Sequence, residues 1–352
     1  MSTCRAFGCD AASQPIHEMT IPRRAPLPND VVIDVMFCGI CHSDLHQVRD
    51  EWGGALFPMV PGHEVVGKVV SVGAEVGRFR SGDLVGVGCM VDSCRACRTC
   101  QRGLEQYCAS APVLTYNNPD PHKTAASTYG GYSETLVCRE EFVFRMPTNL
   151  DAAASAPLLC AGITTYSPLK KFGVTEGTRV GVVGLGGLGH MAVQFAKAMG
   201  AKVTVFTTSA SKVEEAKALG ADRVVLSKDA KAMGEAARSL DFIVDCVAAE
   251  HEMTPYLNAL DFEGEICIVG APPGGSMGRA NAFDFIMGRR RISGSLIGGV
   301  PETQEMLDFC GKHGIACKIE TITAAQINDA YERMLRGDVK YRFVIDLKAS
   351  LK

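Results

Sequence analysis

Four cysteines occupy one short segment at spacings that suit a closed metal site. Cys94, Cys97 and Cys100 recur at every third position, and Cys108 follows after seven intervening residues. Four thiolates on one lobe are the tetrahedral ligand set of a structural zinc ion. Disulfide pairing is one alternative. A zinc ribbon that binds nucleic acid is another, but the arginines of the segment are few, no aromatic ladder accompanies them, and the chain has a net charge of −3. We therefore predict a structural zinc at these cysteines.

A second group of chemically active residues begins at the end of an apolar strand. A cysteine, two histidines, a hydroxyl and a carboxylate fall within six positions, namely Cys41, His42, Ser43, Asp44 and His46. Such crowding predicts a metal site. The simpler alternative is a polar loop that contains an incidental cysteine.

Two other segments supply donors of the same kind. His63 and Glu64 stand immediately before an apolar run, Val65–Val72, and Cys160 lies where a β-rich part of the chain gives way to an alternating part. A purely structural histidine is the plainer explanation of His63. With Cys41, however, His63 and Cys160 would form a catalytic zinc site that keeps one position open for water or substrate. The spacing leaves open whether the three converge.

The segment Val180–His190 is typical of a dinucleotide-binding turn. A short apolar strand runs into a glycine-rich turn and then into a helix that begins near Leu188. Gly184 permits the tight turn, Gly186 lets the backbone approach a pyrophosphate, and Gly189 lets helix and strand pack closely. A glycine turn that binds nothing would have the same pattern. The elements around the turn must therefore distinguish a dinucleotide site from such a turn.

Those elements alternate as a doubly wound sheet requires. Five more apolar runs follow the turn at roughly 20- to 25-residue intervals, and candidate helices separate them. The expected strands are Val203–Phe206, Arg223–Leu226, Asp241–Asp245, Glu265–Gly270 and Ile292–Ile297. The expected helices are Leu188–Met199, Ser211–Leu219, Lys231–Ser239, Met253–Leu260 and Ala280–Met287. We predict an α/β fold with a six-stranded parallel sheet and a ligand crevice at Gly184–Gly189.

The end of the second expected strand indicates which dinucleotide binds. An NAD site normally places Asp or Glu there, about 20 residues past the first glycine, to accept a hydrogen bond from the ribose 2′-hydroxyl. From Lys202 to Val213 there is no carboxylate. Hydroxyls and one cation stand there instead, on Thr207, Thr208, Ser209 and Lys212, and they would hold a 2′-phosphate. We predict NADP(H), against the alternative of an ordinary polar turn.

The first 150 or so residues differ from the alternating part because they are β-rich. Their expected strands are Val31–Cys38, Val65–Val72, Leu84–Val87 and Tyr132–Val137. After the alternating part come a helix, a strand, a helix and a strand, expected at Glu302–His313, near Lys318–Ile322, at Ala324–Leu335 and at Arg342–Leu347. We expect this tail to complete the first domain. The predicted limits are 1–152 with 298–352 for one domain and 153–297 for the other.

The composition limits the class of protein. With 352 residues, of which 47% are hydrophobic and 21% charged, the chain is globular and long enough for two domains. Its net charge of −3 gives no general attraction to nucleic acid or to an anionic membrane. No apolar run reaches the roughly 18 residues that a membrane span needs, and the N-terminus lacks the apolar region of a signal peptide. We expect a cytoplasmic protein.

The motifs together resemble the zinc-dependent medium-chain alcohol dehydrogenases. They are GICHSDLH, VPGHEVVG, the four-cysteine lobe, YGGYSE, LLCAGITTYSPL and VGLGGLGHMAVQFAKAMGA. The resemblance covers nearly the whole chain and is strongest to the cinnamyl alcohol dehydrogenase branch, including its bacterial aldehyde reductases. It implies a GroES-like catalytic domain, made of the first 150 or so residues and the tail, and a Rossmann domain between them.

The resemblance also implies roles for individual residues. Cys41, His63 and Cys160 would bind the catalytic zinc, and Glu64 would approach it when water leaves. Asp44 would orient His63, while Ser43 and His46 would form a proton relay. The cofactor would contact the turn Gly184, Leu185, Gly186, Gly187, Leu188 and Gly189, and also His42, Thr164, Gly270, Ser295, Leu296 and Ile297. His42 stands where many relatives have arginine.

The expected activity is reversible hydride transfer between a primary alcohol and a nicotinamide, mainly as aldehyde reduction, with two zinc ions per chain. The alternatives are a polyol or secondary-alcohol dehydrogenase of the same superfamily, or a non-enzymatic protein that binds zinc and nucleotide. Plant lignin-pathway enzymes use aromatic pocket residues that include tryptophan, whereas the only tryptophan here is Trp52, so cinnamyl aldehydes are not assigned as substrates. An apolar edge strand at Ile292–Ile297 predicts a homodimer.

Overall fold

In the computed structural model, which describes residues 2–276 and 278–351, the chain divides into two units. The first unit comprises Met1–Cys160 and Gly298–Lys352, and the second comprises Ala161–Ile297. The sequence analysis places the first limit earlier, at residue 152, and its domain limits stay a prediction. Each unit has its own sheet, and the two are described separately.

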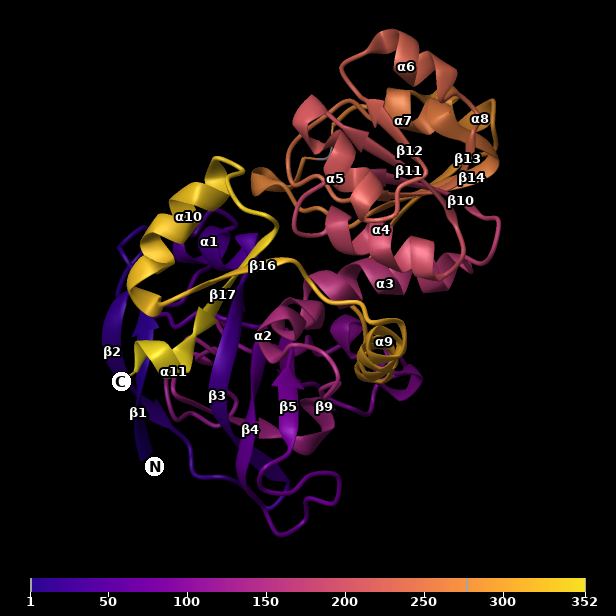
Figure 1. The fold of residues 1–352 in the computed structure, drawn as a ribbon. Helices are drawn as coiled ribbons and strands as arrows, with labels where there is room; N and C mark the ends of the chain where they lie inside the picture. Colours follow the sequence, from indigo (N-terminus) through magenta and orange to yellow (C-terminus); the bar gives the residue numbers. More distant parts are fainter. Residues whose placement is uncertain (1, 277, 352) are drawn as a thin grey trace. The chain divides into compact units, whose positions relative to one another are not determined.

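The first unit is organised around the long strand β3, Asp30–Ile40. Three strands pair with it in antiparallel fashion, namely β4 (Val65–Val72), β8 (Thr135–Arg139) and β17 (Arg342–Asp346). The sheet continues through β5 (Leu84–Val87) and β9 (Val143–Arg145) on one side and β16 (Ile319–Ile322) on the other. In Figure 1 the yellow β17 accordingly lies beside the indigo β3. The C-terminal tail therefore completes the sheet that the N-terminal part begins.

Shorter elements surround this sheet. Two small antiparallel pairs are β1 (Ser2–Gly8) with β2 (His17–Arg23), and β6 (Met90–Asp92) with β7 (Val113–Leu114). The α-helices of this unit are α1 (His42–Val48), α2 (Ala152–Ser155), α9 (Val300–His313), α10 (Ile327–Leu335) and α11 (Leu347–Ser350). Its 3₁₀ turns are η1 (Cys100–Arg102), η2 (Glu105–Tyr107), η3 (Glu140–Phe142), η4 (Ala156–Leu159) and η7 (Ala324–Gln326). The β1–β2 hairpin and helix α1 are absent from the sequence-based expectations.

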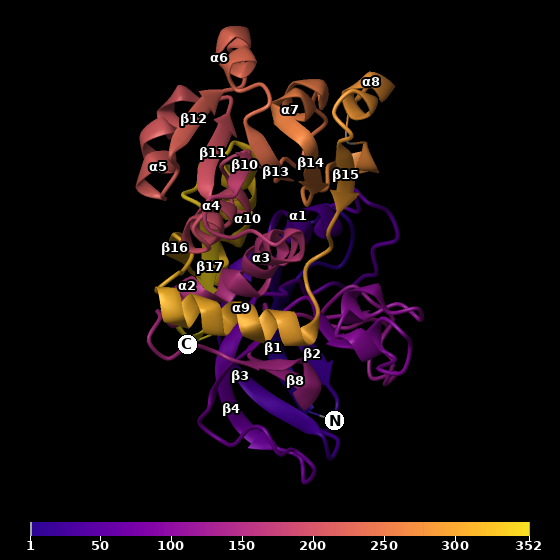
Figure 2. The same cartoon turned by 90° about the vertical axis from the view of Figure 1, so that its right-hand side faces the viewer.

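The second unit is a doubly wound parallel sheet of six strands in the order β12-β11-β10-β13-β14-β15, which can be followed across Figure 2. The strands are β10 (Arg179–Val183), β11 (Lys202–Thr207), β12 (Arg223–Leu226), β13 (Leu240–Asp245), β14 (Leu260–Ile268) and β15 (Arg291–Gly294). Between them lie α4 (Gly189–Ala198), η5 (Ala210–Lys212), α5 (Val213–Ala218), α6 (Ala230–Glu235), α7 (Thr254–Ala259), η6 (Pro273–Gly275) and α8 (Ala282–Ile286), and α3 (Ala161–Phe172) precedes β10. This architecture confirms the predicted α/β fold.

Apolar side chains from the strands and their helices fill the core of this unit. Phe206, Leu240, Ile243, Leu257 and Ile266 are among its buried members. Strands that are buried on both faces consist of continuous apolar runs, and such runs made the strands of this sheet recognisable in the sequence.

The structure corrects the bounds of the last two expected strands. β14 begins at Leu260 rather than at Glu265, because Leu260 already pairs with Leu240 before a register shift in the ladder. β15 ends at Gly294, whereas the sequence predicted a strand through Ile297. The chain leaves the sheet there, and Ile297 has a φ of 36°, outside the extended region. Within the described ranges, no helix combines the length and the apolarity that crossing a membrane requires.

Candidate functional site

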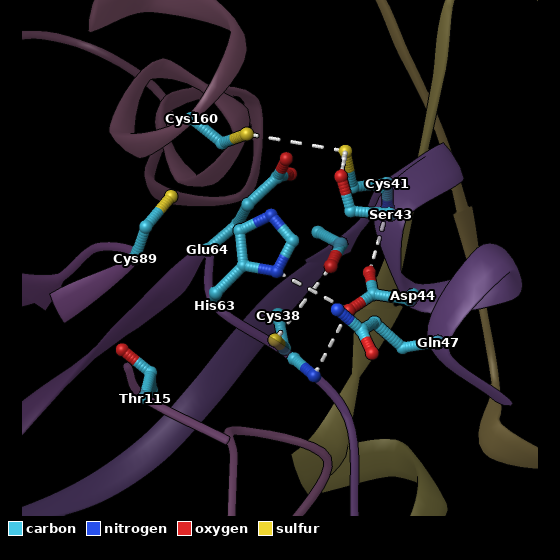
Figure 3. A network of polar contacts seen from close by, with 12 residues as sticks. Cys38, Cys41, Ser43, Asp44, Gln47, His63, Glu64, Cys89, Thr115 and Cys160 are labelled. Atoms are coloured by element: carbon cyan, nitrogen blue, oxygen red, sulfur yellow. Dashed lines mark hydrogen bonds and ion pairs between the residues drawn. The ribbon is translucent and has the colours of Figure 1, made fainter. Parts of the chain in front are cut away.

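Four buried side chains of the first unit bring their donor atoms together. The ligand atoms of Cys41, His63, Glu64 and Cys160 all lie within 4.8 Å of one another, and the two sulfur atoms are 3.9 Å apart. Figure 3 shows them converging from three segments. Cys41 caps α1 directly after β3, His63 and Glu64 precede β4, and Cys160 follows η4. Two thiols, an imidazole and a carboxylate form a donor set that suits zinc.

Asp44 holds two of these segments in place. Its carboxylate accepts hydrogen bonds from the backbone N–H of Cys41 at 2.8 Å and from that of Gly62 at 3.2 Å. It also lies 3.2 Å from His63 Nδ1 and accepts from the hydroxyl of Tyr132 at 3.2 Å. Because the Nδ1 proton of His63 faces Asp44, the Nε2 lone pair is left to bind a metal. The predicted orienting residue thus contacts the histidine that it was expected to orient.

Neighbouring groups shift the pKa values of the two thiols in opposite directions. Contact with the Cys160 thiol, helped by the charge of Arg342, holds the pKa of the Cys41 thiol well below its usual range. Contacts with the thiols of Cys41 and Cys89 raise the pKa of Cys160. Cys41 is therefore the first of the pair to become the thiolate that a metal binds. Desolvation lowers the pKa of His63, but the Asp44 carboxylate outweighs it and the net shift is upward.

Arg342 belongs to this group, although the sequence analysis missed it. It is the first residue of β17, only 4% of it is exposed, and its guanidinium donates a hydrogen bond to Glu64 Oε1. Burial raises the pKa of Glu64 to about 7, and the charge of Arg342 opposes that shift. The second oxygen, Oε2, is buried without a hydrogen-bond partner among the described residues. An unpartnered carboxylate oxygen beside two thiols fits a bound cation.

Glu64 also explains a glycine that the sequence analysis did not single out. A Cβ atom on Gly39 would lie 1.9 Å from Glu64 Oε2. Only glycine therefore lets β3 pass so close to the carboxylate.

The predicted proton-relay residues lie on helix α1. Ser43 Oγ is 3.6 Å from Cys41 Sγ, and the ring of His46 is 6.2 Å from that of the exposed His42. His46 Nδ1 lies 2.5 Å from Glu51 Oε2, and the ring of Trp52 is 4.9 Å from the His46 ring. Glu51 is a second residue that the sequence analysis missed. The available signal was a carboxylate five positions after a histidine, which becomes informative only once α1 is known to be a helix.

The four cysteines of the other predicted metal site also meet. The ligand atoms of Cys94, Cys97, Cys100 and Cys108 lie within 4.8 Å of one another. Backbone N–H groups donate to three of the sulfurs, as from Cys97 to Cys94 Sγ at 3.3 Å, and such bonds favour thiolates. All fifteen cysteines carry free thiols, so the disulfide alternative is wrong. Four sulfurs in this arrangement fit a closed zinc site.

The glycine turn of the second unit follows β10, at the point where the strand order reverses between β10 and β13. Gly184 has a φ of 85°, and a Cβ on Gly189 would lie 1.9 Å from the Gly184 carbonyl oxygen. A Cβ on Gly186 would meet nothing within 4 Å, so the backbone is open there. This cradle at the N-terminus of α4 fits a pyrophosphate.

The residues predicted to select NADP(H) gather beside this turn. Thr207 ends β11 and its Oγ1 accepts a hydrogen bond from the Ser209 N–H at 3.2 Å. Lys212 Nζ donates to the Leu185 carbonyl at 2.8 Å, which places the ammonium group against the glycine turn. Thr208, between them, is exposed. Three hydroxyls and an ammonium group at and after the end of β11 suit a phosphate.

The other predicted cofactor residues of the second unit are dispersed over its loops and one helix. Thr164 is buried in α3. Gly270 follows β14, and a Cβ there would lie 2.3 Å from the Val247 carbonyl oxygen. Ser295, Leu296 and Ile297 follow β15, with the Ser295 N–H bonded to the Ile268 carbonyl at 3.1 Å. Their contacts with a cofactor remain predictions.

Two family models match the chain. Residues 27–148 match "Alcohol dehydrogenase GroES-like domain", and residues 187–312 match "Zinc-binding dehydrogenase". Aldehyde reductase YahK of Escherichia coli is 55% identical over 343 residues, which is 97% of each chain.

Solved structures agree with these matches. A cinnamyl alcohol dehydrogenase from Sorghum bicolor has a TM-score of 0.95 and 46% identity over 99% of both chains. CAD from Helicobacter pylori, complexed with NADP(H), has a TM-score of 0.91 and 41% identity over 99% of both chains.

Two zinc ions per chain with different roles are expected at the two clusters. Cys100→Ser should cost folding, because a structural zinc contributes on the order of 10 kcal/mol to the lobe that it orders. Cys160→Ser should mainly remove activity, since a catalytic metal occupies a site that the fold already shapes. Elemental analysis, thermal melts and an activity assay measure these effects, with Cys246→Ser as the control that keeps both ions. A single zinc per chain in the fully loaded, active protein would contradict this expectation.

Asp44→Asn should weaken the binding of the catalytic metal by about 10- to 100-fold, because the amide no longer fixes His63 as a carboxylate does. The four-cysteine zinc should be unaffected. Zinc retained per chain after dialysis against a graded chelator measures the change. The control is Asp34→Asn. Asp34 lies on β3, is partly exposed and pairs with Lys348. Equal retention by Asp44→Asn and wild type would show that Asp44 does not support the metal site.

Proposed function

The chain belongs to the zinc-dependent medium-chain alcohol dehydrogenases, in their cinnamyl alcohol dehydrogenase-like branch, and we propose that it reduces aldehydes to primary alcohols with NADPH, reversibly. The observation that carries the proposal is the buried cluster of Cys41, His63, Glu64 and Cys160. A panel of primary, secondary and polyol substrates, run in both directions with both cofactors, tests it. Faster turnover of secondary alcohols or polyols than of aldehydes would overturn it.

Cys41, His63 and Cys160 would hold the catalytic zinc, and the glycine turn with Thr207, Ser209 and Lys212 would hold the dinucleotide. When bound, the zinc polarises the carbonyl oxygen of the substrate and the nicotinamide supplies the hydride. The chain itself has to supply a proton to the product oxygen. Ser43 is the hydroxyl beside the cluster, 3.6 Å from Cys41 Sγ.

His46 and Glu51 would serve this proton transfer. The Glu51 carboxylate is 2.5 Å from His46 Nδ1, which holds the Nδ1 proton and leaves Nε2 to exchange a proton. Only 5% of His46 is exposed, so its ring keeps one orientation. The pair therefore forms an oriented base of the kind that proton relays use.

We place the protein in the cytoplasm. The chain has fifteen free thiols, and six of them belong to the two clusters; a secretory compartment would oxidise such thiols.

The cofactor is expected to be NADP(H) rather than NAD(H). Each charge-assisted hydrogen bond to the 2′-phosphate contributes roughly 1.5–3 kcal/mol, so two should favour NADPH by about a hundredfold or more in kcat/KM. Thr207→Asp with Lys212→Ala should narrow or reverse the preference, because the new carboxylate repels the phosphate and accepts a bond from a 2′-hydroxyl.

Steady-state kinetics with both cofactors measure this preference. Lys217→Ala, which removes an exposed lysine of α5 that pairs with Glu214, is the matched control and should leave the ratio unchanged. Wild-type protein that uses NADH as efficiently as NADPH would refute the assignment.

A second copy of the chain is the proposed partner of the edge of the second sheet. β15 is the last strand of that sheet, so one side of it has no neighbouring strand in the described chain. Large apolar side chains are exposed in α8 and in the segment after β15, at 71% for Phe283, 69% for Ile286, 78% for Met287 and 53% for Leu296. An unpaired edge with an apolar surface favours pairing with its own copy about a two-fold axis.

Ile286→Asp with Met287→Asp should convert a homodimer into monomers, because each new carboxylate would lose its hydration in the apolar contact. Light scattering at about micromolar concentration measures the mass. Leu335→Asp, at an exposed apolar residue of α10 in the first unit, should leave the mass unchanged. A monomeric wild type would end the proposal.

A further inference from the structure

A buried carboxylate at the end of β13 holds both ends of the loop that follows. Asp245 is the last residue of this strand and is 1% exposed. Its Oδ1 accepts a hydrogen bond from the Val247 N–H at 3.1 Å, and its Oδ2 lies 3.1 Å from His251 Nε2. One side chain thus spans residues 246–251 and ties the loop to the sheet.

The surroundings of His251 favour a ring that carries two protons. Nδ1 lies 2.9 Å from the Ala249 carbonyl oxygen, and Nε2 lies 3.1 Å from the Asp245 carboxylate. Both neighbouring atoms are acceptors. A neutral ring would turn a nitrogen lone pair towards one of them, whereas an imidazolium has no lone pair on either nitrogen; the Nε2–Asp245 contact is at ion-pair distance but lacks the geometry of a hydrogen bond. A charged ring therefore suits the contact with Asp245.

The loop held in this way forms one wall of the dinucleotide crevice. In a sheet of this order, ligands bind beyond the carboxyl ends of the two strands where the order reverses, here β10 and β13. The glycine turn follows β10, and the loop 246–251 follows β13. A Cβ on Gly184 would lie 3.0 Å from Val247 Cγ2, and one on Gly270 would lie 2.3 Å from the Val247 carbonyl oxygen. Val247 therefore packs directly against two residues expected to line the cofactor.

We infer that His251 is a positioning residue for the dinucleotide: held by Asp245, its ring keeps the Cys246–Val247 backbone against the glycine turn. This inference rests on the proposed function, because it concerns how the same crevice binds NADP(H). The second unit alone supplies every contact on which it depends, and His251 itself has no assigned part in hydride or proton transfer.

The contact between Asp245 and His251 depends on pH in a definite direction. The ring is faced by Asp245 from β13, by the Ala249 carbonyl of its own loop and by the edge-on ring of Tyr256 from α7, 5.6 Å away. The contact with the Asp245 carboxylate raises the pKa of His251 above its ordinary value, against the opposing effect of burial. A group with a raised pKa in the folded state contributes fully at low pH and is lost as the pH rises through that pKa.

The first test measures the dissociation constant of NADPH by fluorescence titration of the zinc-loaded protein from about pH 6 to pH 9. His251→Gln keeps one donor to Asp245 but carries no charge, so binding should weaken about five- to tenfold at the acidic end and lose most of its pH dependence relative to wild type. The control is His17→Gln, which removes an exposed histidine that pairs with Asp10 in the first unit. It should bind as wild type does.

The second test observes the ring in wild-type protein and uses His251→Gln only to assign its resonances. Nitrogen NMR of ¹⁵N-histidine-labelled wild-type protein reports the protonation of each ring, and the resonances absent from His251→Gln identify His251. Two protonated nitrogens at about neutral pH support the inference, and a neutral ring overturns it.

The outcomes separate this inference from the proposed function. If wild type does not bind NADPH, the proposed function fails. If wild type binds NADPH, while His251→Gln binds it equally tightly and with the same pH dependence, only the positioning role of His251 fails.

Discussion

The carboxylate of Asp44 is the constraint on which the metal cluster depends. A fully buried anion is costly unless donors surround it, and here those donors come from three separate segments: the backbone of Cys41, the Gly62–His63 turn and the hydroxyl of Tyr132. The hydrogen bond from Cys41 also closes the first turn of α1. Satisfying this charge therefore places one sulfur and one imidazole nitrogen in the same small volume, before any metal is considered.

A second buried carboxylate, Glu64, has a different partner. Arg342 reaches it from β17, which pairs with β3 across a separation of about three hundred residues in the chain. The guanidinium compensates the charge of Glu64, and its proximity also favours the Cys41 thiolate. The C-terminal tail is thus more than the last strand of a sheet. It contains Arg342, whose positive charge allows the Glu64 carboxylate and the Cys41 thiolate to be buried side by side.

Local patterns predicted the parts of the structure whose residues are close in sequence. The four-cysteine lobe and the glycine turn are each complete within about fifteen residues, so spacing alone was informative. Arg342, Glu51 and the Asp245–His251 pair were missed, because their meaning depends on strand pairing, on the helical state of α1 or on a loop conformation. The convergence of Cys41, His63 and Cys160 likewise needed the resemblance or the structure. The early end of β15 at Gly294 depends on backbone conformation, which an apolar run does not reveal.

Each unit satisfies the charges of its own functional groups internally. In the first unit, Asp44 and Glu64 find their donors among residues 1–160 and 298–352, and in the second unit Asp245 finds them in its own loop. Both units contain a buried carboxylate that accepts hydrogen bonds from backbone N–H groups: Asp44 from Cys41 and Gly62, and Asp245 from Val247. Because such a group is costly until all its donors are in place, it favours one loop conformation over the many that packing alone would allow. The polar residues that carry the chemistry are therefore also those that give each site its shape.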